Sequence, residues 1–179
     1  MFRKLWATLA VAAFGVLVSA GPAHAEDDVV YIVNRANNRC LDAAAQWNGQ
    51  NNTPIQLWDC YPPTQYNQMW RVHWVTNYTY QLISVAGGRC LDARNLGTAD
   101  GTRLQLWDCL GPNQTNQIWK SLRTNTPGYW WIMGEHSAKV VDADASKTGS
   151  NGTPVQLWHL IGSESQTNQR WIFKHAGDF

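Results

Sequence analysis

Three aspartates, each followed at a similar distance by a glutamine and a tryptophan, have the clearest chemical potential in this sequence. In the first set, Asp42 precedes Gln56 and Trp58, and Asn67 follows them. A carboxylate accepts charge-assisted hydrogen bonds from two hydroxyl groups, and the amides of glutamine and asparagine offer both donors and acceptors. An exposed indole presents a flat apolar surface. Because a sugar ring has an apolar face of C–H groups and a rim of hydroxyls, this combination predicts carbohydrate binding.

The set occurs three times, with its aspartates 50 residues apart, which predicts up to three sugar sites. The alternative is structural, because Asp and Asn cap turns and Gln ties strands together. We favour the structural role for Gln68, Gln117 and Gln169, since each lies close to a tryptophan that we assign to the core. For the repeated sets we favour sugar binding, because an outward tryptophan lowers solubility unless a ligand covers it. The candidate sugar-binding residues are Asp42, Gln56, Trp58, Asn67, Asp92, Gln105, Trp107, Asn116, Asp142, Gln156, Trp158 and Asn168.

Internal repetition also predicts the architecture. Each repeat contains three short sequence motifs, always in the same order, which we call its words. The first word ends in Asp-Ala, the middle word contains Gln-Leu-Trp, and the closing word is Asn-Gln-x-Trp. Short β-branched and aromatic runs open the repeats, clusters of turn residues separate the words, and no 3.6-residue apolar period is sustained. We therefore predict an all-β fold of about twelve strands, four per repeat, closed on itself so that few edges are exposed. The repeats span about residues 29–74, 78–122 and 128–174.

Alternation along a strand separates the outward tryptophans from the core ones, because successive side chains point to opposite faces. In the first middle word, Ile55 and Leu57 share one face, while Gln56 and Trp58 share the other. The aliphatic face belongs in the core, so Trp58, Trp107 and Trp158 are predicted to lie on the outer face. The closing-word tryptophans show the opposite pattern or follow it by analogy, and we predict that they are core residues. They are Trp70, Trp119 and Trp171.

Four cysteines allow three disulfide connectivities, and the third repeat favours one of them. That repeat has Val140 and Leu160 where the other two repeats have cysteines. The loss of both positions together is the behaviour of a contacting pair. The predicted disulfides are Cys40–Cys60 and Cys90–Cys109.

These motifs resemble the ricin B-type lectin domain, through Cys-Leu-Asp, Gln-Leu-Trp-x-Cys and a threefold Gln-x-Trp over residues 29–174. The resemblance implies a β-trefoil with pseudo-threefold symmetry and up to three sites, for galactose-type or xylan-type ligands. It also implies that the first-word Asp, the middle-word Gln and aromatic residue, and the closing-word Asn contact sugar. All three repeats match at these positions. The third departs at Val140, His159 and Leu160, which leaves the sugar residues in place but removes a bridge that would make the site rigid.

The N-terminal residues have the layout of a secretory signal peptide. Arg3 and Lys4 precede an apolar run over residues 5–20, and Ala23-His24-Ala25 offers a small-x-small cleavage site. The run is shorter than the roughly 20 residues that a membrane span needs. We therefore expect residues 1–25 to be removed, leaving one secreted lectin domain over residues 26–179, in an oxidising compartment where disulfides persist.

Composition and motifs argue against other classes of protein. The formal net charge is +1, and −1 without Arg3 and Lys4, so nucleic acid and anionic membranes are poor partners. We expect no cofactor and no metal, because the histidines lack ligand spacing, and no enzyme, because no paired carboxylates recur. The alternative function is a glycan-docking subunit of a secreted toxin or adhesin complex, with a protein partner.

Overall fold

The structure is a computed structural model that describes residues 28–147, 149–163 and 165–179. The predicted leader, residues 1–25, lies outside the described residues. Within them the chain forms twelve strands and six short 3-10 helices, with no α-helix. The strands are β1 Asp28–Asn34, β2 Cys40–Ala43, β3 Ile55–Trp58, β4 Met69–Trp74, β5 Tyr80–Ser84, β6 Cys90–Ala93, β7 Leu104–Trp107, β8 Trp119–Arg123, β9 Trp130–Gly134, β10 Val140–Ala143, β11 Thr153–Trp158 and β12 Trp171–Lys174. The 3-10 helices are η1 Ala45–Trp47, η2 Tyr66–Gln68, η3 Arg94–Leu96, η4 Thr115–Gln117, η5 Thr167–Gln169 and η6 Ala176–Asp178.

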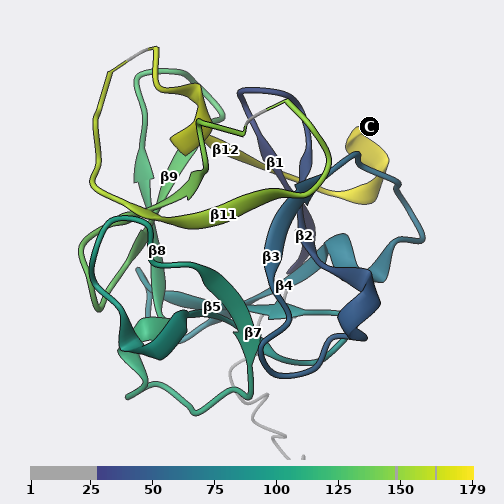
Figure 1. The fold of residues 1–179 in the computed structure, drawn as a ribbon, viewed down its shortest axis with the longest axis vertical. Coiled ribbons are helices and arrows are strands. Elements are labelled where there is room, and N and C mark those ends of the chain that lie inside the picture. The colour runs from purple at the N-terminus through teal and green to yellow at the C-terminus, as the bar shows by residue number, and fades with distance from the viewer. Residues whose placement is uncertain (1–27, 148, 164) are drawn as a thin grey trace, which may run out of the picture.

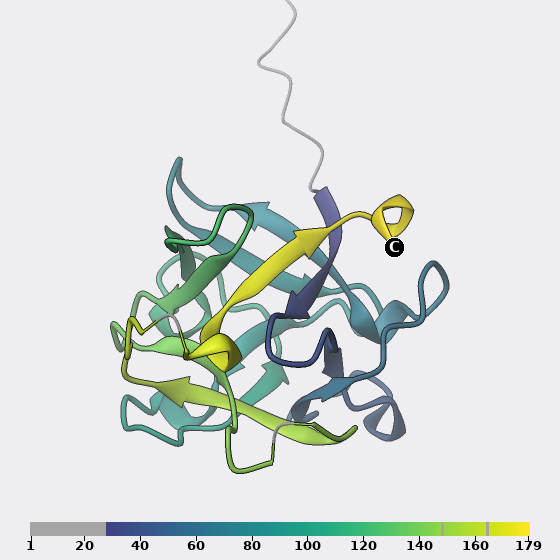
Figure 2. The same ribbon diagram turned by 90° about the horizontal axis from the view of Figure 1, so that it is seen from above.

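Six of the strands close into a barrel. β1 pairs with β4, β4 with β5, β5 with β8, β8 with β9, β9 with β12 and β12 with β1, all antiparallel. Each strand of this ring has a partner on both sides, so the barrel has no open edge. β1 and β12 lie side by side, and the start of β1 and the end of β12 reach the same end of the molecule (Figure 2).

The other six strands form three hairpins, β2–β3, β6–β7 and β10–β11. Each hairpin follows the end of a barrel strand, β1, β5 or β9, so the three together cap one end of the barrel. Neighbouring hairpins also pair with one another, through β11 and β3 and through single bridges at Pro54–Gln105 and Arg103–Gln156. The three lobes surround a common centre in Figure 1, coloured blue, teal and yellow-green. The predicted β-trefoil with pseudo-threefold symmetry is confirmed.

The barrel and the cap enclose one main core. Alternate residues of the hairpin strands supply its aliphatic part, and Leu57, Leu106 and Leu157 are at most 1% exposed. Trp70, Trp119 and Trp171, at the starts of β4, β8 and β12, are also at most 1% exposed. The core position predicted for the closing-word tryptophans is therefore confirmed, and each repeat contributes one large ring to the centre.

The loop inside each hairpin fastens the next repeat. Asn51, in the first hairpin, donates from Nδ2 to Asp108 Oδ2 at 2.8 Å. Its Oδ1 accepts from Arg89 Nε, also at 2.8 Å, while Arg89 pairs with Asp108. Repeat 1 thereby holds the first and middle words of repeat 2 together. The same contacts join Asn151 of repeat 3 to Arg39 and Asp59 of repeat 1.

In the third of these junctions the residue types are exchanged. Asp100, in the second hairpin, accepts from Lys139 Nζ and contacts His159 Nδ1, both at 2.7 Å. Hydrogen bonds from Lys139 and His159 lower the pKa of Asp100 to about 2. In the other two junctions the loop supplies an asparagine and the residue after the middle-word tryptophan is an aspartate. Here the loop supplies the acid, Asp100, and His159 follows the tryptophan. These contacts tie the third hairpin at the place where the other two repeats have a disulfide.

The structure contains the disulfides Cys40–Cys60 and Cys90–Cys109, the pairing that the third repeat indicates. Their sequence separations are 20 and 19 residues. We expect non-reducing peptide mapping to recover fragments linked in these two pairs. Removing either bridge as a Cys→Ala double variant should lower the free energy of unfolding by about 3 kcal/mol, because it releases a loop of this length in the unfolded chain. Recovery of a fragment linking Cys40 to Cys90 would contradict the pairing.

Candidate functional site

The two strands of each hairpin place the candidate acid opposite the candidate glutamine. Asp42 on β2 faces Gln56 on β3, and Cys40 faces Trp58 two residues along. Gln56 donates from Nε2 to Asp42 Oδ1 at 3.0 Å. The equivalent bonds are Gln105 to Asp92 at 3.0 Å and Gln156 to Asp142 at 3.2 Å.

The closing word approaches the same carboxylate from the other side. Asn67 Nδ2, in η2, donates to Asp42 Oδ2 at 2.8 Å and to the Ala43 carbonyl at 3.0 Å. Gln68 Nε2 donates to Asp42 Oδ2 at 3.0 Å and to the Asp59 carbonyl at 2.8 Å. Three amides thus hold one carboxylate in each repeat. The equivalent residues are Asn116 and Gln117 around Asp92, and Asn168 and Gln169 around Asp142.

The core tryptophan completes this arrangement. Trp70 Nε1 donates to the carbonyl of Leu41, the residue before Asp42, at 2.9 Å. Its counterparts bond at 3.2 Å and 2.9 Å to the carbonyls before the other two aspartates, through Trp119 to Leu91 and Trp171 to Val141. The Asn-Gln-x-Trp word therefore binds the Asp word through its amides and its indole. This accounts for both words recurring together, and it supports the structural role that we favour for Gln68.

The carboxylates are more deeply buried than the sequence suggests. Asp42, Asp92 and Asp142 are 2%, 4% and 3% exposed. Burial raises the pKa of each carboxyl above the ordinary 3.8, and the amide hydrogen bonds lower it only in part. The amides that cover these acids are themselves buried at Gln105 and Gln156.

This network reduces what each acid can offer a ligand. A carboxylate has about four acceptor positions, and Oδ2 of Asp42 already accepts two amide bonds while Oδ1 accepts one. The acid therefore has room for one hydroxyl on Oδ1 rather than the two expected from the sequence. Both amide hydrogens of Asn67 are also in use, so it presents only its oxygen. The reason is the closing turn, whose approach to the acid is not visible in the strand pattern.

The middle-word tryptophans lie beside these acids with graded exposure. Trp58 is 37% exposed, whereas Trp107 and Trp158 are half-buried. Hollows of about 160 Å³ and 430 Å³ lie beside the latter two, and they bring together the predicted residues of the second and third repeats. The residues that line them from the predicted sets are Asp92, Gln105, Trp107 and Asn116, and Asp142, Gln156, Trp158 and Asn168.

Comparison with protein-family models identifies the family of this chain. The family model of the ricin-type β-trefoil lectin domain-like family matches residues 66–158, more than half of the chain. The chain belongs to this family. No curated protein sequence matches the chain.

Solved structures also resemble this ricin-type domain. A designed threefold-symmetric protein, ThreeFoil, has a TM-score of 0.72 at 24% identity, covering 82% of this chain and 97% of its own. A Macrolepiota procera ricin B-like lectin, solved with lactose, has a TM-score of 0.68 at 22% identity, covering 84% and 97%. An exo-β-1,3-galactanase from Clostridium thermocellum has a TM-score of 0.71 at 27% identity, covering 83% of this chain but only 30% of the galactanase. The first two likenesses support the fold, and the third spans under a third of its enzyme.

The ricin-type domain also has candidate site residues that the sequence pattern did not single out. Leu110 and Ile161 line the second and third hollows, and Tyr61 occupies the equivalent place in the first repeat. Their backbone N–H groups all donate to the closing-word glutamine. The available signal was position, because each lies three residues after a middle-word tryptophan.

The candidate sites of this ricin-type domain differ in their glutamine oxygens. Gln105 Oε1 is buried without a hydrogen-bond partner, and it belongs to a residue that lines the second hollow. In the third repeat, Gln156 Oε1 instead accepts from Arg103 Nη1 at 3.0 Å. A ligand hydroxyl should therefore contribute most to binding at the second candidate site, because it would donate to a buried acceptor that has no other partner.

Across the described ranges 28–147, 149–163 and 165–179, no group of three His, Cys, Asp or Glu residues could hold a metal ion. No helix in that part of the chain is long and apolar enough to cross a membrane.

Proposed function

We propose that this protein is a secreted lectin with up to three sugar sites, one per repeat. The observation that carries the proposal is the threefold recurrence of one carboxylate, held by amides, beside an outward-facing indole. An indole stacks on the apolar face of a sugar, and a preorganised carboxylate accepts a hydroxyl without first having to be ordered. In this proposal the Asp binds one hydroxyl, the Gln and Asn supply the remaining polar contacts, and the Trp binds the ring. The proposed sets are Asp42, Gln56, Trp58 and Asn67; Asp92, Gln105, Trp107 and Asn116; and Asp142, Gln156, Trp158 and Asn168.

We propose galactose-type or xylan-type glycans as ligands. The solved structure of the similar Macrolepiota procera lectin is of a complex with lactose, and the protein with a similar segment from Clostridium thermocellum is named an exo-β-1,3-galactanase. Both support a galactose-type ligand. The proposal includes no catalysis, because each repeat presents a single carboxylate rather than the pair that glycoside hydrolysis needs.

Residues 1–25 are proposed to be the signal peptide and residues 26–179 the lectin domain. The apolar run and the small-x-small site support export. The two disulfides support an oxidising compartment.

A glycan array with the chain starting at residue 26 tests the proposal directly. We expect binding to galactose-type or xylan-type glycans by the wild type. A triple Trp58→Ala, Trp107→Ala, Trp158→Ala variant should lose this binding while retaining its far-UV circular dichroism spectrum. Equal array binding by the folded triple variant would rule out these sites.

The alternative is a glycan-docking subunit of a secreted toxin or adhesin complex. A similar structure, a mosquitocidal holotoxin with a TM-score of 0.68, contains this fold as 17% of a larger chain. Affinity purification from culture supernatant distinguishes the two, since a stoichiometric protein partner would favour the subunit.

Sugar affinity is expected to fall on acidification at a pH above 3.8. The reason is that burial raises the pKa of Asp42, Asp92 and Asp142 in the folded protein, and a protonated carboxyl loses its charge-assisted hydrogen bond. The ionised carboxylates bind the sugar. They are present above the raised pKa and are lost as the pH falls through it. Monosaccharide titration calorimetry between pH 7 and pH 4, with circular dichroism to verify folding, measures the midpoint. A midpoint at or below 3.8 would show that these acids are not the groups that bind.

A further inference from the structure

The barrel also has a hollow at the end opposite the hairpin cap. This hollow, of about 510 Å³, opens where β1 begins and β4 and β12 end, and residues from all six barrel strands line it. Its volume is within the range of small-molecule pockets, about 300–1,000 Å³. None of the repeated sugar-binding residues takes part in it. This barrel-mouth hollow is therefore distinct from the three proposed sugar sites.

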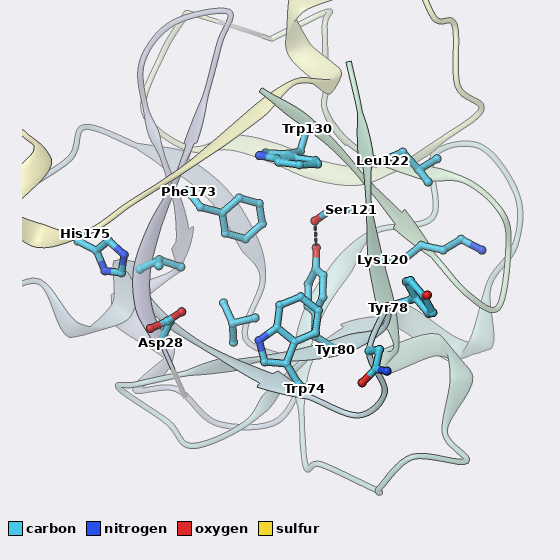
Figure 3. A pocket seen from close by; sticks show the side chains of 13 residues that line it. Asp28, Trp74, Tyr78, Tyr80, Lys120, Ser121, Leu122, Trp130, Phe173 and His175 are labelled. Atoms are coloured by element: carbon cyan, nitrogen blue, oxygen red, sulfur yellow. Dashed lines mark hydrogen bonds between the residues drawn. The ribbon is translucent and has the colours of Figure 1, made fainter. Parts of the chain in front are cut away.

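Aromatic side chains dominate the barrel-mouth hollow. Trp74 and Phe173 face into it, with Trp130 above them (Figure 3), and Tyr80, which is 1% exposed, packs against Trp74 and Phe173. Trp74 and Tyr80 meet edge to face, with centroids 5.4 Å apart and planes at 74°. Tyr80 and Phe173 do the same at 6.4 Å and 89°. Rings at right angles present both faces and edges, which are the two surfaces that a further aromatic ring prefers.

Among the polar side chains that line this hollow, only Tyr80 is buried; Asp28, Asn77 and His175 are exposed, and Lys120 is half-buried. Tyr80 Oη and Ser121 Oγ share a hydrogen bond of 2.7 Å, drawn dashed in Figure 3. Two hydroxyls carry two hydrogens, and their mutual bond uses only one, so the pair can still donate one hydrogen bond. Burial raises the pKa of Tyr80, which keeps its hydroxyl neutral and able to donate.

The exposed aromatic residues at the opening indicate that a ligand covers them, and the residues that line the hollow indicate the chemical class of that ligand. Trp74 is 51% exposed and Tyr78 81% exposed at the opening. Val30, Val72 and Phe173 line the interior with apolar atoms. A pyranose has hydroxyls around its whole rim, and those that met these apolar walls would lose their water without gaining partners. A flat apolar ring system with a single polar substituent fits both the walls and the hydroxyl pair.

We propose that the barrel-mouth hollow binds one small aromatic molecule with a single hydrogen-bonding substituent, independently of the sugar sites. The ring lies among Trp74, Phe173 and Trp130, and the substituent accepts from Ser121 Oγ, the half-buried member of the Tyr80–Ser121 hydroxyl pair. This goes beyond the proposed lectin function, because it assigns a ligand class to a surface that no repeated motif marks.

Equilibrium dialysis of the chain starting at residue 26 with 2-naphthol tests the proposal. We expect saturable binding of one 2-naphthol per chain. Trp74→Ala should weaken it at least fivefold, because it removes one ring of the wall. Ser121→Ala should weaken 2-naphthol about threefold but leave naphthalene unchanged, since only 2-naphthol has the oxygen that uses the hydroxyl pair.

Trp58→Ala is the matched control, because it removes another exposed indole that lies outside the hollow, and its 2-naphthol binding should equal that of the wild type. Excess lactose should displace none of the bound 2-naphthol. Three results would overturn the proposal: no saturable binding, unchanged binding by Trp74→Ala, or displacement by lactose, which would make the hollow a sugar site. Each leaves the glycan-array result unaffected, so this inference and the lectin proposal fail separately.

Discussion

Replacing Trp70 with alanine is expected to lower the free energy of unfolding by about 3–5 kcal/mol, the usual range for truncating a core aromatic ring. Trp70 is fully buried at the centre of the barrel. Its indole N–H also donates to the Leu41 carbonyl at 2.9 Å, so the substitution removes a ring and leaves a buried acceptor without its donor. Urea denaturation followed by circular dichroism measures the loss.

Trp58→Ala is the matched control for this loss. Trp58 lies on the opposite face of its hairpin and is 37% exposed, so its replacement should change stability by less than about 1 kcal/mol. Trp70→Phe separates the two contributions, because it keeps most of the bulk but not the N–H, and should fall between wild type and Trp70→Ala. Equal destabilisation by Trp58→Ala and Trp70→Ala would show that the two faces have been assigned wrongly.

Disabling one of the proposed sugar sites is expected to reduce polysaccharide affinity far more than it reduces the number of monosaccharides bound. A shallow site with one indole should have a dissociation constant of about 0.1–1 mM, or roughly −4 to −5.5 kcal/mol. Sites in three separate lobes cannot all grip one short sugar, but they can grip a polymer. There the second contact becomes intramolecular, and affinity rises by about 10²-fold.

Trp58→Ala is a better probe of this effect than Asp42→Ala. Removing Asp42 would leave the amides of Gln56, Asn67 and Gln68 without their shared acceptor and would disturb the fold. With Trp58→Ala we expect monosaccharide stoichiometry to fall by about a third, and retention on an immobilised polysaccharide to fall by about tenfold or more. Titration calorimetry and affinity electrophoresis measure the two. One monosaccharide site per wild-type chain, or equal affinity for monomer and polymer, is incompatible with this prediction.

Much of the fold was predictable, because the repeats carry redundant information. The 50-residue spacing gave the number of lobes, and alternation within the Gln-Leu-Trp words separated Leu57 from Trp58 correctly. The paired substitution at Val140 and Leu160 indicated the disulfide partners, which the structure contains. In each case three copies of one pattern served as their own comparison.

Other features depend on contacts that no strand pattern encodes. The burial of Asp42 under three amides arises because a closing turn 25 residues away folds over it. Asp100 stands where the loops of the other repeats have asparagine, and the reason is visible only in its contact with His159, 59 residues later. The barrel-mouth hollow collects Trp74 from the first repeat, Tyr80 from the second, and Trp130 and Phe173 from the third, and these residues occupy no shared motif.

The fastening of each repeat by the loop of its predecessor has a consequence for how such a protein can evolve. Asn51 reaches into repeat 2, Asp100 into repeat 3, and Asn151 back into repeat 1, so the contacts run in a circle. A linear array of repeats can lengthen by duplication at either end, because its terminal copies have a free side. Here a fourth copy would have to break one junction and widen a closed six-stranded barrel, while a deletion would leave a loop with nothing to fasten. Copy number is therefore fixed by geometry, and variation is confined to exchanging residues within the circle, as the Asp100–His159 pair illustrates.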